Sequence, residues 1–348
     1  MENDFTVTCP IPITDRKNIV LGHGSGGRLT AQLIHDVFLP AFDNEILRKL
    51  DDQAVFQLGG TRMAFTSDSF VVTPLFFPGG DIGKLAVNGT VNDLSMSGAR
   101  PLYLSASFII EEGFELEELS RVVQSMADAA RDADVAIVTG DTKVVNKGSA
   151  DKLFINTAGV GLVPDGIEIS ASKARPGDAI LLSGTIGDHG MAVFSKREGL
   201  EFEGSILSDT VGLYSLVEAM LAAGEIHALR DPTRGGLGMS LCEIAGAANI
   251  GIEIVANSVP VREDVKAACE ILGLDALFVA NEGKLVAFVE PASADAVLSA
   301  MRRHPQGRDA ALIGHAVSAH KGMVLLRTEV GGTRLIDLPF TEQLPRIC

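Results

Sequence analysis

The spacing of apolar and polar residues in the first half of the chain predicts alternating strands and helices. Residues 62–72 have the pattern of a strand that runs into a polar turn, and residues 102–110 form a second run rich in strand-forming residues. Across residues 119–133 the apolar positions recur at helical spacing, which places on one helical face Leu119, Val122, Val123, Met126 and Ala130. Residues 135–141 predict a short buried strand, and residues 153–163 predict another strand.

The second half begins after a turn-rich segment, residues 163–178, which we take as a domain boundary. Regular pattern then resumes, with a strand starting at 179, helices at 213–224 and 240–250, a strand at 284–290 and a hairpin around Gly331 and Gly332. Because both halves mix helix and strand, and 348 residues exceed the usual size of one core, the pattern predicts a two-domain α/β (α+β) protein.

Composition narrows the class of protein without identifying its activity. The chain is 46% hydrophobic and carries a formal net charge of −16, which argues against a surface for nucleic acid or for anionic membranes. It has no apolar run near the roughly 18 residues of a membrane span and no signal-peptide pattern at its start, so we expect a cytoplasmic protein. Its four cysteines lack paired spacing and indicate neither a disulfide framework nor a zinc cluster.

A glycine-rich loop, Gly22 to Arg28 with the sequence GHGSGGR, precedes a helix-like segment at residues 29–38. Its glycines leave several backbone N–H groups able to face phosphate oxygens, and a helix N-terminus favours negative charge. The loop matches neither the Walker A pattern nor the dinucleotide fingerprint. By itself it fits a flexible turn equally well.

Aspartates recur where predicted strands meet loops, at Asp51, Asp52, Asp68, Asp93 and Asp141. Mg²⁺ prefers oxygen ligands and binds nucleotides through a few carboxylates together with phosphate oxygens. Each aspartate alone is explained by turn or cap chemistry. The set, beside a glycine-rich loop, favours a site for magnesium and a nucleotide.

Several other positions carry chemistry that has a plain structural alternative. Lys143 is able to neutralise phosphate charge or, if desolvated, to act as a base, although a single lysine is usually a surface cation. Asp231 stands before a proline and fits either a helix cap or a ligand contact. Glu282 lies in a turn between apolar runs, where a solvated side chain is the default. His23 and His189 have no partners at metal-ligand spacing, so neither is assigned to a metal.

The last residue of the sequence is a cysteine, Cys348, on a short segment that contains Pro339 and Pro345. A residue at a chain end has too few neighbours to be buried unless another part of the protein docks it. The prenylation signal places its cysteine fourth from the end and therefore does not apply. A role in the core does not explain this thiol.

Taken together, these motifs closely resemble the HypE family, the carbamoyl dehydratases of NiFe-hydrogenase maturation. The resemblance runs from Ile19 to Cys348 and rests on GHGSGGR, TSDSFVVTPLFFPGGDIGKLAVNGTVNDLSMSGARP, TGDTKVV, LFINTAGVG, SGTIGDHG, LRDPTRGG, FVANEGKLV and the terminal LPRIC. Nucleotide-site motifs combined with a terminal Pro-Arg-Ile-Cys are highly specific. Residues 1–17, which include Cys9, have no obvious counterpart.

The resemblance implies membership of the aminoimidazole-ribotide synthetase (PurM-like) superfamily. Its members have two α/β domains, depend on ATP, and dimerise by pairing their N-terminal sheets into a barrel with ATP near the interface. Carried over to this chain, the resemblance divides it into an N-terminal extension (1–17), an ATP-binding domain (18–168), a C-terminal domain (169–338) and a mobile tail (339–348).

The resemblance also implies roles for individual residues. It assigns Mg²⁺ to Asp51, Asp52, Asp68, Asp93 and Asp141, and ATP to Gly24, Ser25, Gly26, Gly27, Asp68, Asp93, Asp141 and Thr142. The catalytic residues are then Cys348, Lys143 and Glu282. In the family, HypF loads the terminal cysteine as a thiocarboxamide, ATP phosphorylates the amide oxygen so that it departs as phosphate, and a thiocyanate results. The HypC–HypD scaffold receives the cyanide on its iron.

Two other interpretations are open. Selenophosphate synthetase, in the same superfamily, carries a reactive cysteine near its N-terminus, as Cys9 does here, but has no use for the terminal cysteine motif; selenide-dependent consumption of ATP would identify it. A non-catalytic scaffold whose tail only docks a partner belongs to a different class, and a measurement of ATP binding would separate it from an enzyme.

Overall fold

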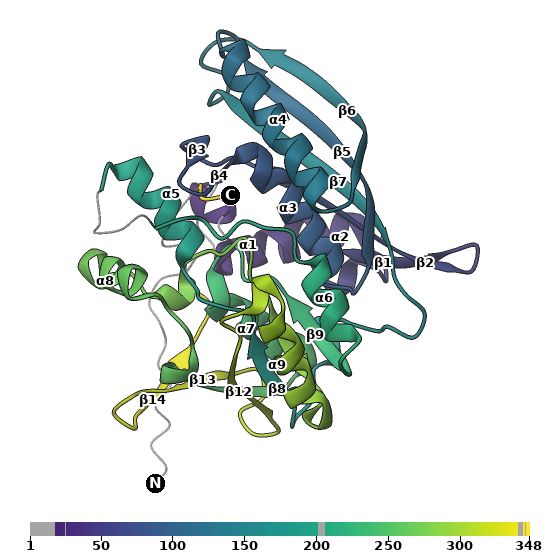
Figure 1. The fold of residues 1–348 in the computed structure, drawn as a ribbon, viewed down its shortest axis with the longest axis vertical. Helices are drawn as coiled ribbons and strands as arrows, with labels where there is room; N and C mark the ends of the chain where they lie inside the picture. The colour runs from purple at the N-terminus through teal and green to yellow at the C-terminus, as the bar shows by residue number, and fades with distance from the viewer. Residues whose placement is uncertain (1–17, 25, 201–205, 340–343, 345) are drawn as a thin grey trace.

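The computed structural model describes residues 18–24, 26–200, 206–339, 344 and 346–348, and it contains two large sheets with helices packed against them (Figure 1). The first half of the chain forms α1 (Arg28–Leu33), α2 (Leu39–Phe42), β1 (Ala54–Leu58), β2 (Thr61–Phe70), β3 (Phe76–Phe77), β4 (Gly80–Asp81), α3 (Ile82–Ser95), β5 (Arg100–Glu111), α4 (Leu116–Asp132), β6 (Ala136–Val145) and β7 (Leu153–Leu162). The second half forms β8 (Ala179–Leu182), α5 (Asp188–Glu198), α6 (Tyr214–Leu221), β9 (Ile226–Arg230), α7 (Gly236–Ala248), β10 (Gly251–Val255), α8 (Glu263–Leu272), β11 (Val286–Val289), α9 (Ala294–Arg303), β12 (Ala311–Val317), β13 (Val324–Arg327) and β14 (Thr333–Ile336).

The first sheet has the strand order β1-β2-β7-β5-β6, with every pair antiparallel except β5 and β6. Helices α3 and α4 pack together beside it. The helical face predicted for residues 119–133 is largely confirmed, because Val122, Met126 and Ala130 are buried in the core between α4 and the sheet. Val123 is 46% exposed, so the buried stripe is narrower than the apolar pattern suggested.

Strand β6 differs from its prediction as a short buried strand. It extends over ten residues, nine of which are exposed, including Ile137, Val138 and Val144. The physical reason is its position: β6 is the edge strand and pairs only with β5 among the described strands. An apolar run indicates a strand that avoids water, but it does not say which surface covers that strand.

The second sheet has the order β14-β13-β10-β12-β8-β11-β9, and helices cover both of its faces. The central strand β8 is buried throughout, with Ile180 packed in the core that contains α7 and Leu181 in the core that contains α6 and α9. The predicted hairpin is confirmed as β13 and β14, whose turn includes Gly331 at φ +83°. Helix α7 begins four residues before the predicted start, at Gly236.

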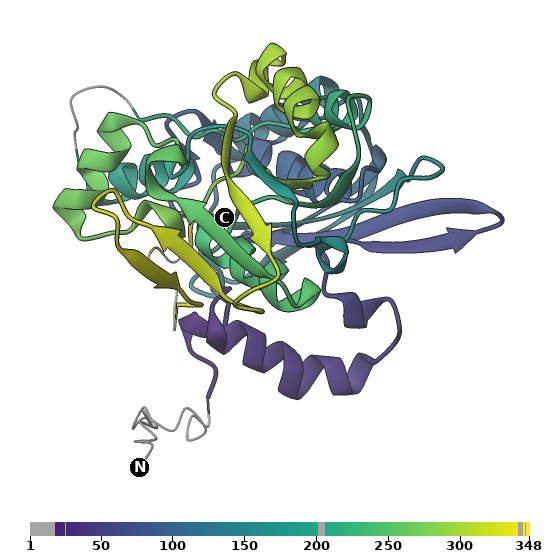
Figure 2. The ribbon, with the colours of Figure 1, turned by 90° about the horizontal axis from the view of Figure 1, so that it is seen from below.

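The turn-rich segment at 163–178 connects the two sheets. Asp51, from the first half, accepts hydrogen bonds there from Ser170 Oγ (2.8 Å) and from the Ala171 backbone N–H (3.0 Å). Helices α1 and α2 are joined by a π-helical turn, Ile34–Phe38, and lie at the lower edge of the molecule in the view of Figure 2. None of the described helices is both long and apolar enough to cross a membrane.

Candidate active site

Five carboxylates from both halves of the chain converge where the two sheets meet, and we call them the carboxylate cluster. They come from separate elements: Asp52 precedes β1, Asp68 lies in β2, Asp93 in the last turn of α3, Asp231 directly after β9 and Glu282 in the loop before β11. Their proximity is electrostatic as well as spatial, because repulsion from Asp68 adds to burial in raising the pKa of each of the other four. The fold therefore assembles them from positions up to 230 residues apart in sequence.

Cations and hydroxyls partner part of this cluster. Arg230 Nε lies 3.1 Å from Asp52 Oδ1, and Arg230 Nη2 lies 2.7 Å from Glu243 Oε2. Thr66 Oγ1 lies 2.8 Å from Asp93 Oδ2. These contacts fix the orientation of two of the five carboxylates.

Burial makes the cluster electrostatically unfavourable in its ionised form. Asp231 and Glu282 are 5% and 3% exposed, and Asp231 Oδ2 and Glu282 Oε1 have no hydrogen-bond partner among the described residues. Burial raises the pKa of Asp52 to about 6, with Arg230 opposing the shift. Burial, followed by repulsion from neighbouring carboxylates, raises the pKa of Asp93, Asp231 and Glu282 well above the usual range. Such a set is completed chemically by a hard cation that takes oxygen ligands.

The glycine-rich loop lies against the segment that follows Asp231. Arg234 Nη1 donates to the carbonyl of Gly24 (3.3 Å), and a Cβ on Gly26, at φ +86°, would stand 2.7 Å from Met239 Cε. Only glycine fits this approach without displacing its neighbour. Gly27 immediately precedes α1, and the predicted contact at Ser25 lies outside the described residues.

Asp231 and Glu282 both differ from the simplest local interpretation. Because α7 starts at Gly236 with Gly235 at its N-cap, Asp231 does not cap it. Glu282 is not a solvated turn residue: Asn92 Nδ2 donates to its carbonyl oxygen (3.1 Å), and its own N–H donates to Asp209 Oδ1 (3.0 Å). Both residues are buried.

Three of the predicted site residues, the ligands Asp141 and Thr142 and the catalytic Lys143, lie outside the cluster on the exposed strand β6. Lys143 Nζ lies 2.7 Å from Asp141 Oδ2, and their side chains are 67% and 62% exposed; we call these two residues the edge pair. Hydrogen bonds from Lys143 and from the Thr142 backbone lower the pKa of Asp141. The carboxylate of Asp51, also a predicted ligand, accepts hydrogen bonds from Ser170 Oγ at the connection between the sheets, and its role in binding Mg²⁺ stays a prediction.

A shallow groove of about 640 Å³ runs between β6 and α4 beside the edge pair. Apolar residues from both elements and from β5 line it, together with Gly140, Asp141 and Thr142: Ala106, Phe108, Val123, Met126, Ala127, Ile137 and Val138. The edge pair therefore stands at the rim of an apolar surface rather than inside a completed pocket.

The described part of the tail is docked against the first half of the molecule and against α5 of the second half. The Val71 N–H donates to the main-chain oxygen of Cys348 (3.2 Å), and Arg346 Nη2 lies 2.6 Å from Asp151 Oδ2. Leu344 and Ile347 are 3% and 1% exposed. A terminal residue was expected to be buried only if docked, and this segment meets that condition. Its predicted mobility stays a prediction.

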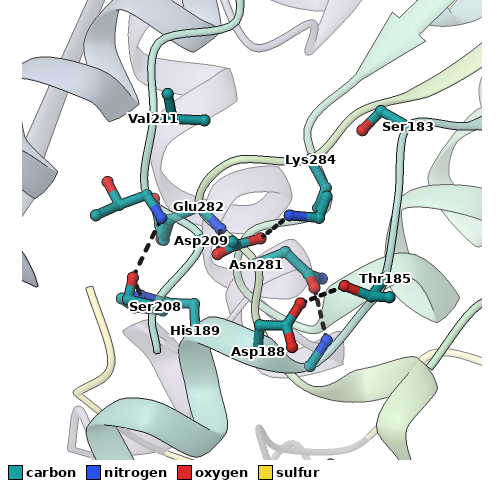
Figure 3. Close-up of polar contacts among 12 residues, drawn as sticks. Ser183, Thr185, Asp188, His189, Ser208, Asp209, Val211, Asn281, Glu282 and Lys284 are labelled. Atoms are coloured by element: carbon teal, nitrogen blue, oxygen red, sulfur yellow. Dashed lines mark hydrogen bonds and ion pairs between the residues drawn. The ribbon is translucent and has the colours of Figure 1, made fainter. Parts of the chain in front are cut away.

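Sequence reasoning missed a second polar group beside Glu282, drawn in Figure 3. Asp209 Oδ2 lies 3.1 Å from Lys284 Nζ, and Asp188 accepts a hydrogen bond from Thr185 Oγ1. Asp209 stands in a loop without any local motif, so nothing in its surroundings marked it. Lys284 follows Glu282 by two residues and could have been noticed from that spacing alone.

Comparisons with known proteins relate both halves of the chain to one family. Residues 50–163 match the N-terminal domain of AIR synthase related proteins, and residues 175–326 match their C-terminal domain. Carbamoyl dehydratase HypE from Bradyrhizobium diazoefficiens is 58% identical over 330 residues, which cover 94% of this chain and 95% of that protein.

Solved structures with similar folds include a chain from a HypE–HypF complex, with TM-score 0.84, 52% identity, and coverage of 88% of this chain and 99% of that one. HypE in complex with ATP gives TM-score 0.81 and 51% identity, covering 95% of this chain and 100% of that chain. The predicted α/β fold with two PurM-like halves is confirmed by these matches. They do not test the predicted dimer barrel.

Proposed function

This chain belongs to the HypE carbamoyl dehydratases of the AIR synthase related family, and from that premise we propose that it dehydrates a carbamoyl group carried on its own Cys348, using ATP. The product would be a thiocyanate, whose cyanide is destined for the iron of a NiFe-hydrogenase. The observation that carries the proposal is the docked tail: the main-chain oxygen of Cys348 binds Val71, three residues after Asp68 of the carboxylate cluster.

The carboxylate cluster supports the binding of Mg²⁺ with ATP. Asp52, Asp68, Asp93 and Asp231 offer only hard oxygen donors, and the buried Asp231 Oδ2 has no hydrogen-bond partner among described residues. When bound, Mg²⁺ neutralises phosphate charge and so favours phosphoryl transfer. The loop containing Gly24 and Gly26 would cover the phosphates, since Arg234 ties it to the segment after Asp231.

Glu282 is the residue we assign to proton removal from the thiocarboxamide nitrogen. A carboxylate accepts a proton effectively near neutral pH when its pKa is raised, and burial followed by repulsion from Asp231 raises the pKa of Glu282 well above its usual range. Its backbone is fixed at both sides, by Asn92 at the carbonyl and by Asp209 at the N–H. The side chain is therefore held rather than left to a flexible turn.

Lys143 enters this scheme through a second copy of the chain. The edge pair is solvated in one protomer, and beside it β6 exposes Ile137, Val138 and Val144 along a strand edge that no other described strand pairs with. A homodimer formed across this surface would cover the apolar residues and desolvate Lys143, which then strengthens its interaction with phosphate or with the amide oxygen.

The same premise names the partners. We propose that HypF loads Cys348, in keeping with the HypE–HypF complex among the similar structures, and that the HypC–HypD scaffold accepts the cyanide. We propose the cytoplasm as the place where these proteins meet.

Intact-mass spectrometry tests the proposal directly. The full chain is incubated with HypF, carbamoyl phosphate and ATP, and the mass of the adduct is followed over time. We expect one carbamoyl adduct that loses one water as ATP is hydrolysed, and no adduct on the Cys348→Ala variant. A carbamoyl adduct on that variant would move the reaction to another cysteine, with Cys9 the first to examine.

A further inference from the structure

We propose that His189 is a positioning residue that holds the docked tail by the peptide carbonyl directly before Cys348. His189 Nε2 lies 3.1 Å from the carbonyl oxygen of Ile347, and the ring is fully buried in the first turn of α5. The contact places a fixed donor one residue from the thiol. The role of this contact in catalysis rests on the proposed function, whereas the hydrogen bond itself does not.

The hydrogen-bond chain through the ring has only one consistent direction. A carbonyl oxygen accepts and never donates, so Nε2 must carry the proton. In the neutral ring Nδ1 is then an acceptor, and Ser208 Oγ, 2.8 Å away, donates to it. The Thr210 N–H in turn donates to Ser208 Oγ (3.2 Å). Thr210, Ser208, His189 and Ile347 thus form a relay that selects the tautomer able to hold the tail.

Burial supports the neutral state on which this direction depends. Desolvation lowers the pKa of His189, with Asp209 and the Ile347 carbonyl opposing the shift. The ring packs against Phe77 in a T-shaped arrangement, with centroids 5.4 Å apart and planes at 87°. This packing limits rotation of the ring, so the donor stays aimed at the tail.

The same turn of α5 is tied to the loop that carries Glu282. The Gly187 N–H donates to Asn281 Oδ1 (2.7 Å), and the Gly190 N–H donates to the Ala280 carbonyl oxygen (3.0 Å). Figure 3 shows His189 and Glu282 on these neighbouring segments, on either side of Asp209. His189 therefore sets the position of the tail relative to the segment that carries the proposed base.

Alkylation of Cys348 by iodoacetamide measures tail docking in the full chain without ATP, HypF or carbamoyl phosphate. The rate is read from the mass of the C-terminal peptide. We expect His189→Leu to react about tenfold faster, because it leaves the Ile347 carbonyl without its donor. His189→Gln, which retains an N–H donor on a similar reach, should stay within about threefold of wild type. Ser208→Ala, which removes tautomer selection but keeps the ring, should react about threefold faster.

Ser195→Ala is the matched control, because Ser195 is buried on the same helix and its Oγ donates within α5 to Met191. It should react at the wild-type rate. Wild-type rates in both His189→Leu and Ser208→Ala would overturn the proposal, as would an equal acceleration in Ser195→Ala, which would indicate general loosening of α5. If His189→Leu fails to fold, Ser208→Ala decides by the same criterion.

Dehydration provides a second reading that separates this proposal from the proposed function. In chains already loaded on Cys348, His189→Leu should slow single-turnover loss of water about tenfold, with His189→Gln restoring most of the rate. If His189→Leu is alkylated faster but HypF does not load the wild-type chain, the tail contact is supported. Only the dehydratase assignment is then refuted. Unchanged alkylation with normal dehydration would refute only the role of His189.

Discussion

The carboxylate cluster and the edge pair contain the same kinds of residue in opposite surroundings. In the cluster, burial raises the pKa of Asp93 and Asp231, whereas hydrogen bonds from Lys143 and Thr142 lower the pKa of the solvated Asp141. The cluster is built entirely by one chain and retains excess negative charge. The edge pair is already neutralised and stands on an uncovered strand. On the proposed function, the carboxylate cluster binds a cation and the edge pair is covered by a second copy of the chain.

The largest effect on activity is expected from a substitution in the carboxylate cluster. Asp93→Asn should reduce magnesium-dependent ATP hydrolysis by about 10³-fold, because the amide keeps the shape but removes charge that the cation needs. Loading of Cys348 by HypF should persist. Asp178→Asn, at a buried aspartate bound to His227 Nδ1 (2.9 Å) outside the cluster, serves as the control. Unchanged hydrolysis in Asp93→Asn would place this carboxylate outside the metal site.

Chemistry rather than nucleotide binding is tested at Glu282. Glu282→Gln should leave ATP binding and carbamoyl loading intact but slow formation of the thiocyanate by about 10²-fold, the usual scale for loss of a general base. Single-turnover dehydration of the preloaded chain is the measurement, with loading checked by mass. A wild-type rate would return Glu282 to a structural role in its loop.

Lys143 tests whether the edge pair is as separate from the site as one protomer suggests. An exposed ion pair contributes little to binding or stability. Lys143→Ala should therefore leave the rate of dehydration unchanged if β6 stays solvated. If a second chain desolvates the pair, dehydration should slow by about 10²-fold, which is our expectation. Combined with Glu282→Gln, the two defects should be less than additive, because both groups then serve one transition state.

The surface beside the edge pair is tested by Val144→Glu. Val144 is 68% exposed, so the change should leave the free energy of unfolding of the protomer within about 0.5 kcal/mol of wild type. A charge buried in a dimer interface is costly, and the dimer dissociation constant should rise at least about tenfold. Sedimentation at micromolar concentration measures it. A wild-type chain that is strictly monomeric and fully active would contradict the proposed interface.

The smallest expected effects are on the free energy of unfolding. They compare the removal of one charge from the carboxylate cluster with the removal of one charge from the edge pair. Without Mg²⁺, Asp231→Asn should raise the free energy of unfolding by about 1 kcal/mol, because it relieves repulsion among buried carboxylates. Asp141→Asn, on the exposed strand, should change it by less than about 0.5 kcal/mol. Denaturant titration measures both. Equal effects would remove the energetic distinction between the regions.

Local pattern was sufficient to predict much of the fold and three of the five members of the carboxylate cluster. The hairpin of β13 and β14 and the buried face of α4 follow from spacing that each segment carries by itself. Asp52, Asp68 and Asp93 were identified because they lie where strands and helices end, and the fold brings such ends together. These residues needed no knowledge of long-range contacts.

The remaining site residues depend on contacts between loops that are remote in sequence. Asp231 resembled a helix cap until α7 was found to start at Gly236, and His189 lacked any sequence neighbour that could explain it. Asp209 meets Glu282 across 73 positions, a pairing that no periodicity encodes. Strand β6 is a further example. Its apolar pattern predicts burial but does not identify the surface that would cover it.

The docked tail has a consequence for the order of events in a reaction cycle. Val71, Thr73 and His189 all bind it through main-chain oxygens, those of Cys348, Arg346 and Ile347 respectively. These three contacts do not involve the sulfur, so on the proposed function we expect bare thiol, thiocarboxamide and thiocyanate to use one resting place. A tethered segment also experiences an effective concentration of about millimolar, which makes even a weak dock well populated. The direction of the reaction cycle then comes from ATP consumption and from the successive partners. The backbone contacts that hold the tail do not distinguish the thiocarboxamide from the thiocyanate.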